Sequence, residues 1–150
     1  MENRFKNYRA FTLIEVLLVI GIMGIIAAAY FSASQFGQQS KALSVATRNL
    51  VTDLRYAQQL SVTDQITHGI QISTALSSYK LVRFSTTTKE FFDKDLPTGI
   101  SFHDVSGFTS DEIKFNAYGA VDEDGTVTLI NTESATTTID VRPSGFVRIL

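Results

Sequence analysis

The sequence offers few side chains whose types and spacing suggest catalysis. Its imidazoles, His68 and His103, form no His-Glu-x-x-His pattern and have no matching set of metal ligands. The chain of 150 residues contains no cysteine, which excludes a thiol nucleophile, a disulfide framework and a thiolate zinc site. It also has no Gly-x-Ser-x-Gly elbow and no Gly-rich phosphate loop. We therefore predict a protein that is not an enzyme and that has no cofactor.

An acidic cluster, Asp122, Glu123 and Asp124, stands directly before Gly125. It resembles a fragment of a calcium loop, but the other ligands of an EF-hand are missing. The Asp124–Gly125 pair also precedes an alternating segment, in which case Gly takes the positive φ of a hairpin turn. The hairpin is the favoured interpretation, and no metal site is predicted.

Glu15 has the most unusual position among the ionisable residues. Residues 11–31 are apolar except for Thr12 and Glu15, and no Lys, Arg or His lies between residues 10 and 40. A carboxylate inside a membrane segment is costly and usually has a partner, so we expect a cation from outside this helix. The alternative is a carboxylate that reaches the headgroup region and has no further role.

Arg142 and Arg148 flank a Pro-Ser-Gly turn and are the candidate contacts for nucleic-acid phosphates. Residues 32–150 contain ten Lys and Arg against thirteen Asp and Glu, a net charge of −3. Affinity for DNA comes largely from neutralising phosphates with basic side chains. Two arginines in an acidic segment are a small footprint, so nucleic-acid binding is the second hypothesis.

The apolar run that contains Glu15 is predicted to be a transmembrane helix. Its 21 residues would span about 31 Å, the thickness of the hydrocarbon core of a bilayer. Arg4, Lys6 and Arg9 precede it and the next basic residue is Lys41, so the positive-inside tendency places the N-terminus in the cytoplasm. Two alternatives remain: a buried helix of a soluble domain, and a signal peptide cleaved near residues 27–29.

Helical periodicity continues beyond the apolar run to about residue 62, now in amphipathic form. The apolar residues that share an arc of about 80° are Phe36, Leu43, Ala46, Leu50, Leu54 and Ala57. Beyond residue 63 the period becomes two, which predicts strands over 66–72, 79–84, 100–103, 112–117, 126–131, 137–142 and 146–150. A long helix followed by antiparallel strands is an α+β arrangement, with the sheet packed on the amphipathic half of the helix.

The junction from Arg9 to Val16, with the motif Phe-Thr-Leu-Ile-Glu at residues 11–15, resembles the processing site of type IV prepilins and type II secretion pseudopilins. The resemblance implies cleavage between Ala10 and Phe11 by a prepilin peptidase and N-methylation of Phe11. It also implies that Glu15, at the fifth mature position, pairs with the amino terminus of a neighbouring subunit. Two departures are that Ala10 replaces the usual Gly and that no Pro occurs near the end of the run.

Further segments are similar to the GspH/FimT family of minor pseudopilins and minor pilins. They are residues 50–59, 96–100, 113–115 leading to Gly119, 125–129 and 145–149. Some members of this family are associated with DNA uptake. The resemblance therefore implies a structural filament subunit, with a DNA-binding minor pilin as the alternative.

These observations divide the chain into a cleaved basic leader at residues 1–10, a transmembrane and assembly helix at 11–31 and an exported domain at 32–150. The expected partners are other pilins, the prepilin peptidase and the assembly platform of the inner membrane. The expected location is the cytoplasmic membrane, in a single span, and then a pilus or pseudopilus.

Overall fold

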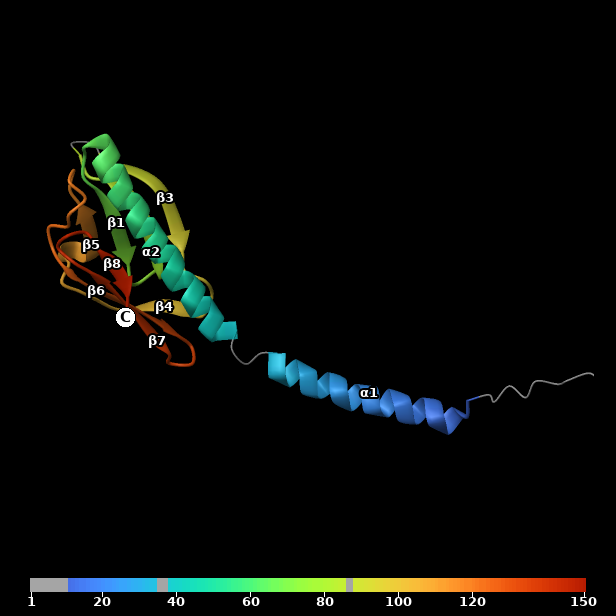
Figure 1. Ribbon diagram of the computed structural model, residues 1–150. Coiled ribbons are helices and arrows are strands. Elements are labelled where there is room, and N and C mark those ends of the chain that lie inside the picture. The colour runs from blue at the N-terminus through green and yellow to red at the C-terminus, as the bar shows by residue number, and fades with distance from the viewer. Residues whose placement is uncertain (1–10, 35–37, 86–87) are drawn as a thin grey trace, which may run out of the picture. The chain divides into compact units, whose positions relative to one another are not determined.

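The computed structural model describes residues 11–34, 38–85 and 88–150. The chain divides into two units, one that ends at Gly37 and one that begins at Gln38. Helix α1 (Leu13–Ser34) belongs to the first unit. The second unit contains helix α2 (Gln38–Asp64) and the strands (Figure 1). The helix predicted to continue from the apolar run to about residue 62 includes residues 35–37, which lie outside the described residues.

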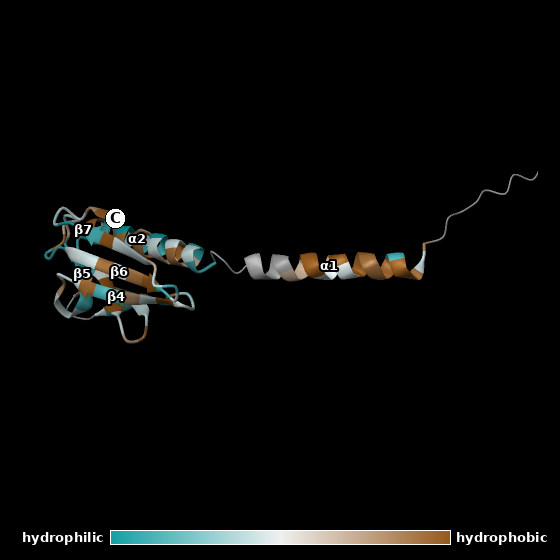
Figure 2. Cartoon of the chain, turned by 90° about the horizontal axis from the view of Figure 1, so that it is seen from below, coloured by the Kyte–Doolittle hydropathy of each residue, from teal (hydrophilic) through white to brown (hydrophobic). Residues whose placement is uncertain are grey.

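Helix α1 is apolar over most of its described surface (Figure 2). Its large side chains from Leu13 to Ile26 are exposed. Among the residues that the structure describes, no helix meets both the length and the hydropathy needed to cross a bilayer. The membrane span predicted over residues 11–31 therefore stays a prediction.

Helix α2 is the element on which the second unit is built. Of the apolar stripe predicted from periodicity, Leu43, Ala46, Leu50, Leu54 and Ala57 are buried, whereas Phe36 lies outside the described residues. The helix contacts strands of both sheets. The core therefore lies between this face of α2 and the inner faces of the two sheets.

The strands form two antiparallel sheets, whereas the sequence predicts a single sheet. The first sheet has the order β3 (Lys89–Asp95), β2 (Ser78–Arg83), β1 (His68–Ser73), β5 (Glu112–Phe115). The second has the order β4 (Ile100–Ser106), β6 (Gly125–Asn131), β7 (Thr136–Val141), β8 (Val147–Ile149), and a short 3-10 helix, η1 (Thr109–Asp111), precedes β5. The chain is thus α+β, with a helix packed on antiparallel sheets.

Strand β3 was not expected from the sequence, and a buried carboxylate holds it against α2. Lys94 of β3 donates hydrogen bonds to both carboxylate oxygens of Asp53, at 2.8 and 2.9 Å, and the Tyr79 hydroxyl of β2 donates to the same group at 2.7 Å. Burial, together with this carboxylate, raises the pKa of Tyr79. The hydroxyl therefore keeps its proton and remains a donor throughout the physiological range.

The prediction of a hairpin turn at Asp124–Gly125 is wrong. Gly125 has no positive φ and is the first residue of β6, which pairs with β4 and β7. The preceding strand, β5, belongs to the other sheet, so this segment is a crossover between sheets. Glycine is needed there for a different reason: an added Cβ would lie 2.1 Å from the carbonyl oxygen of Ser106 in β4.

Candidate functional site

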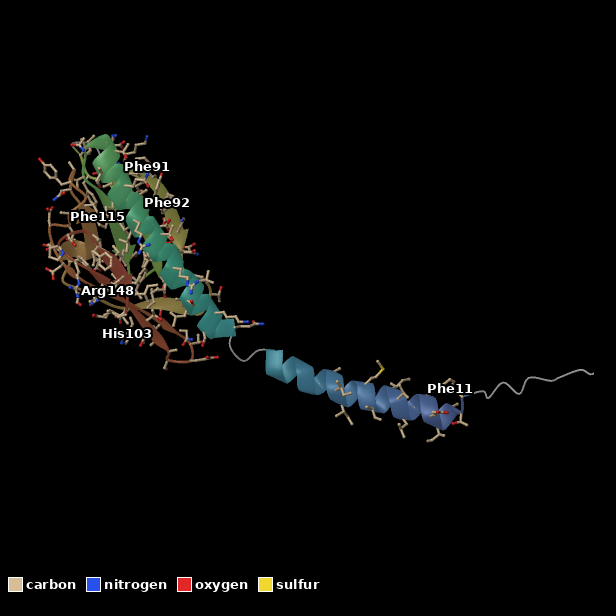
Figure 3. The ribbon with its side chains drawn as sticks, viewed as in Figure 1. Phe11, Phe91, Phe92, His103, Phe115 and Arg148 are labelled. Atoms are coloured by element: carbon tan, nitrogen blue, oxygen red, sulfur yellow. The ribbon has the colours of Figure 1, made fainter. Side chains whose placement is uncertain are left out.

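The predicted processing and assembly residues lie at the start of α1. Ala10 lies outside the described residues, so the structure places only the second residue of the predicted cleavage site. Phe11, labelled in Figure 3, is 79% exposed. Its side chain does not contribute to a folded core, which leaves it available for an intermolecular role.

Thr12 begins the helix by satisfying its first free amide groups. The backbone N–H of Glu15 lies 3.1 Å from the carbonyl oxygen of Thr12 and 3.4 Å from its hydroxyl oxygen, and the N–H of Val16 donates to the same carbonyl at 3.2 Å. A Thr at the N-cap with a Glu three residues later is the residue order of a capping box. The motif that resembles a prepilin site therefore also forms a well-specified helix start.

Glu15 stands in the first turn of α1, where the helix dipole favours a negative charge. Its carboxylate makes no ion pair with another described residue. It lies on an open groove of one helix face together with Phe11, Val16, Val19 and Ile20. This arrangement is an exposed acid on an apolar helix face, the site at which a neighbour's cation is predicted to bind.

Arg142 and Arg148, predicted as candidate phosphate contacts, are brought together by a shared carboxylate. Arg142 Nε lies 3.1 Å and Arg148 Nε 3.0 Å from the same oxygen of Asp140. The hydrogen bond from Arg142, and then that from Arg148, lowers the pKa of Asp140. Asp140 is therefore ionised at neutral pH and cancels one of the two positive charges.

The turn between β7 and β8 fixes this geometry. Gly145 has a φ of 79°, a conformation that favours glycine, and its N–H donates to the carbonyl of Arg142 at 2.8 Å. The register then places Asp140 directly across from Arg148. The Pro-Ser-Gly turn predicted from the sequence is confirmed.

Two further arginines adjoin Arg148 and were not among the predicted site residues. Arg48 and Arg55 of α2 line the same surface groove as Arg148, and the guanidinium of Arg55 donates to the carbonyl of Val147 at 3.2 Å. They are seven residues apart, which places them on one side of a helix. That spacing was visible in the sequence, and a strand over residues 146–150 was predicted, but the packing of this strand beside α2 was not.

The two histidines lie in strands of different sheets. His68 begins β1 and is fully buried, with Nδ1 2.8 Å from the carbonyl oxygen of Ile66 and Nε2 3.3 Å from Asp64. His103 is exposed on β4. Within the described ranges, no group of three His, Asp or Glu residues is arranged to hold a metal ion.

The acidic cluster is partly engaged in a loop contact. Glu123 accepts hydrogen bonds from the backbone N–H of Thr109 at 2.6 Å and from its hydroxyl at 2.7 Å. These bonds lower the pKa of Glu123. The carboxylate therefore serves to tie the segment before β6 to η1.

Comparison with known proteins identifies the N-terminal segment and the fold. Residues 5–31 match the family described as the prokaryotic N-terminal methylation motif. No curated protein matches the chain in sequence.

Solved structures with a similar fold include minor pilins and a minor pseudopilin. The minor pseudopilin EpsH from the type 2 secretion system of Vibrio cholerae matches with a TM-score of 0.62 at 11% identity, over 72% of this chain and 95% of that one. The type IV minor pilin FimU of Pseudomonas aeruginosa matches with a TM-score of 0.61 at 13% identity, over 77% of this chain and 92% of that one. The motif and the fold together confirm the resemblance to type IV pilin-like proteins and type II secretion pseudopilins.

Proposed function

We propose, from the premise that this pilin-like chain carries a prepilin methylation motif, that it is a minor pilin or minor pseudopilin. It would be a non-enzymatic structural subunit of a type II secretion pseudopilus or type IV pilus. The observation that carries the proposal is the joint presence of the motif over residues 5–31 and a pilin fold in the same chain. Either feature alone would leave the function open.

The proposed pathway begins in the cytoplasmic membrane. A prepilin peptidase would cleave between Ala10 and Phe11, and the new amino terminus would be methylated. The apolar run at residues 11–31 would hold the protein in the membrane with residues 32–150 exported. The assembly platform would then extract the subunit into a filament, where α1 packs against other pilins.

The first prediction concerns the mature N-terminus. Full-length protein expressed in a host that has a prepilin peptidase and extracted from membranes should have lost residues 1–10 and gained one methyl group. Intact-mass analysis with N-terminal peptide sequencing measures both changes. A mature chain that begins beyond Ala27 would show a conventional signal peptide and would exclude the pilin proposal.

DNA capture remains the second candidate, and one observation favours it. Arg148 shares a groove with Arg48 and Arg55, so the basic surface extends beyond the two arginines first considered. Against it stand the pairing of Arg142 and Arg148 with Asp140 and the net charge of −3 over residues 32–150.

We therefore expect only weak, nonspecific binding of duplex DNA at physiological salt, with a Kd of about 10⁻⁴–10⁻⁶ M. Fluorescence anisotropy with labelled duplex and the detergent-solubilised full chain measures it. Submicromolar binding that is lost in the Arg142→Ala, Arg148→Ala double variant, but kept in Lys89→Ala, would rank DNA capture above the structural role.

A further inference from the structure

A groove between α2 and the C-terminal strand has the composition of a peptide-binding surface. We call it the arginine groove and define it by Arg48, Val51 and Arg55 of α2 and Phe146, Arg148 and Ile149 of the C-terminal segment. In Figure 1, β8 lies beside α2, and Figure 2 shows the C-terminus next to the same helix. A second hollow shares Arg55 and Phe146 and extends the groove toward Gly145.

The groove carries positive charge that its own walls do not cancel. Arg48 is exposed, and its guanidinium makes no ion pair with any described residue. Arg55 donates to a neutral backbone carbonyl and forms no ion pair with a carboxylate of the described residues. Arg148 shares Asp140 with Arg142, so its charge is partly neutralised from outside the lining. A site with these groups favours an anionic ligand, although the unit as a whole is acidic.

Apolar side chains in the same groove argue for a polypeptide rather than duplex DNA. Phe146 is 56% exposed and Ile149 44% exposed, and both line the groove beside the buried Val51. Burying apolar surface of this kind contributes about 25 cal/mol per Å². The phosphate backbone of a duplex gains nothing from such contacts, whereas the acidic and apolar side chains of one polypeptide segment use both properties of the groove.

We propose that the arginine groove binds an extended, carboxylate-bearing segment of a partner protein. Arg48 and Arg55 are about 10 Å apart along the helix axis at 1.5 Å per residue. An extended chain in the polyproline II conformation rises about 3.1 Å per residue with three residues per turn, so carboxylates three residues apart lie on one face and match this spacing. The inference goes beyond the filament role, since it concerns a surface of the second unit and requires neither α1 nor processing.

The test uses the full chain in detergent micelles and a fluorescein-labelled synthetic peptide of Glu-Val-Thr repeats. Its matched control is the same peptide with Gln in place of Glu. Anisotropy should show binding of the Glu peptide that weakens with added salt. The Gln peptide should bind at least about tenfold more weakly, a difference of about 1.4 kcal/mol.

Charge-reversal variants locate the site. Arg48→Glu should weaken binding by about tenfold or more, because an exposed helix residue can change its charge without loss of the fold. Lys89→Glu makes the same change of charge on β3, in the other sheet, and should have little effect. Circular dichroism of both variants checks that α2 and the sheets are intact.

Three results would each overturn the proposal. One is equal binding of the Glu and Gln peptides, and another is an equal loss of affinity in Arg48→Glu and Lys89→Glu. The third is displacement of the peptide by duplex DNA at lower concentration than by unlabelled peptide, which would assign the groove to nucleic acid.

Discussion

Glu15→Ala should yield a protein that is processed, retained in the membrane and folded, yet largely excluded from filaments. The carboxylate lies exposed in the first turn of α1, and no ion pair with a described residue neutralises it. Cleavage before Phe11 would create an α-amino group, and a staggered neighbour could place that group beside Glu15. Opposite charges about 4 Å apart attract by about 4 kcal/mol at an effective dielectric constant of 20.

The loss of that pair should reduce co-purification with partner pilins and the fraction of subunit in sheared filaments by at least about tenfold, since each 1.4 kcal/mol corresponds to a factor of ten. Glu15→Gln should show the same defect, because it removes the charge and preserves the size of the side chain. Thr12→Ala is the matched control: it removes the N-cap hydroxyl, typically about 1 kcal/mol of helix stability, and leaves the charge in place.

A subunit at a filament tip has no neighbour ahead of it, so there the Glu15 defect would shift to recruitment of the next partner. Unchanged co-purification together with unchanged secretion or piliation would contradict the prediction. Glu15 would then be a charge tolerated near the membrane edge, stabilised by the helix start.

Phe115→Ala is expected to have the largest effect on the stability of the second unit. Phe115 is fully buried on β5, opposite His68 of β1, and its backbone also bridges to Val121. Truncation of a buried Phe removes transfer free energy and leaves a cavity, a loss of about 3–5 kcal/mol. Domains of this size are stable by about 5–15 kcal/mol, so the variant should be close to unfolding.

Urea denaturation of the full chain in detergent, followed by near-ultraviolet circular dichroism, measures the change in free energy of unfolding. Phe91→Ala makes the same substitution on β3, where the side chain is 42% exposed, and should cost much less. Equal losses in the two variants would mean that the second unit lacks the single core described above.

How much of this could be read from the sequence depends on how strongly each segment is patterned. The buried stripe of α2 follows from the helical period, because Leu43, Leu50 and Leu54 recur on one face of a helix without competing signals. Strand β3 could not be found in the same way. Its sequence, Lys-Glu-Phe-Phe-Asp-Lys-Asp, places adjacent Phe residues among charges and gives no alternation.

The local pattern of residues could not predict which strand belongs to which of the two sheets. Strands β4 and β5 are near neighbours in sequence but belong to different sheets, and Gly125 starts a strand after the crossover. An Asp-Gly pair before an alternating run indicates a hairpin unless the preceding strand pairs elsewhere. That pairing depends on how the strands pack on α2. Contacts of this kind join residues far apart in the chain, so a short stretch of sequence does not reveal them.

In the candidate site, too, some features could be predicted from the sequence and others could not. Glu15 was identified from the sequence because a lone carboxylate in an apolar run has few explanations. The grouping of Arg48 and Arg55 with Arg148 depended on which edge strand lies beside α2. The capture of Arg148 by Asp140 depended on the β7–β8 register, which reduced the charge that the sequence suggested for phosphate contact.

The edges of the two sheets limit aggregation between copies of the second unit. Within the described residues, β8 has three residues and β5 four, and β3 and β4 each carry a register irregularity in the pairing with their neighbours. β3 also presents Lys, Glu and Asp side chains along its length. Short, bulged or charged edges are poor templates for strand addition by another copy. Copies of the second unit therefore have little tendency to join edge to edge, and under the proposed function polymerisation would depend on α1 rather than on contacts between sheets.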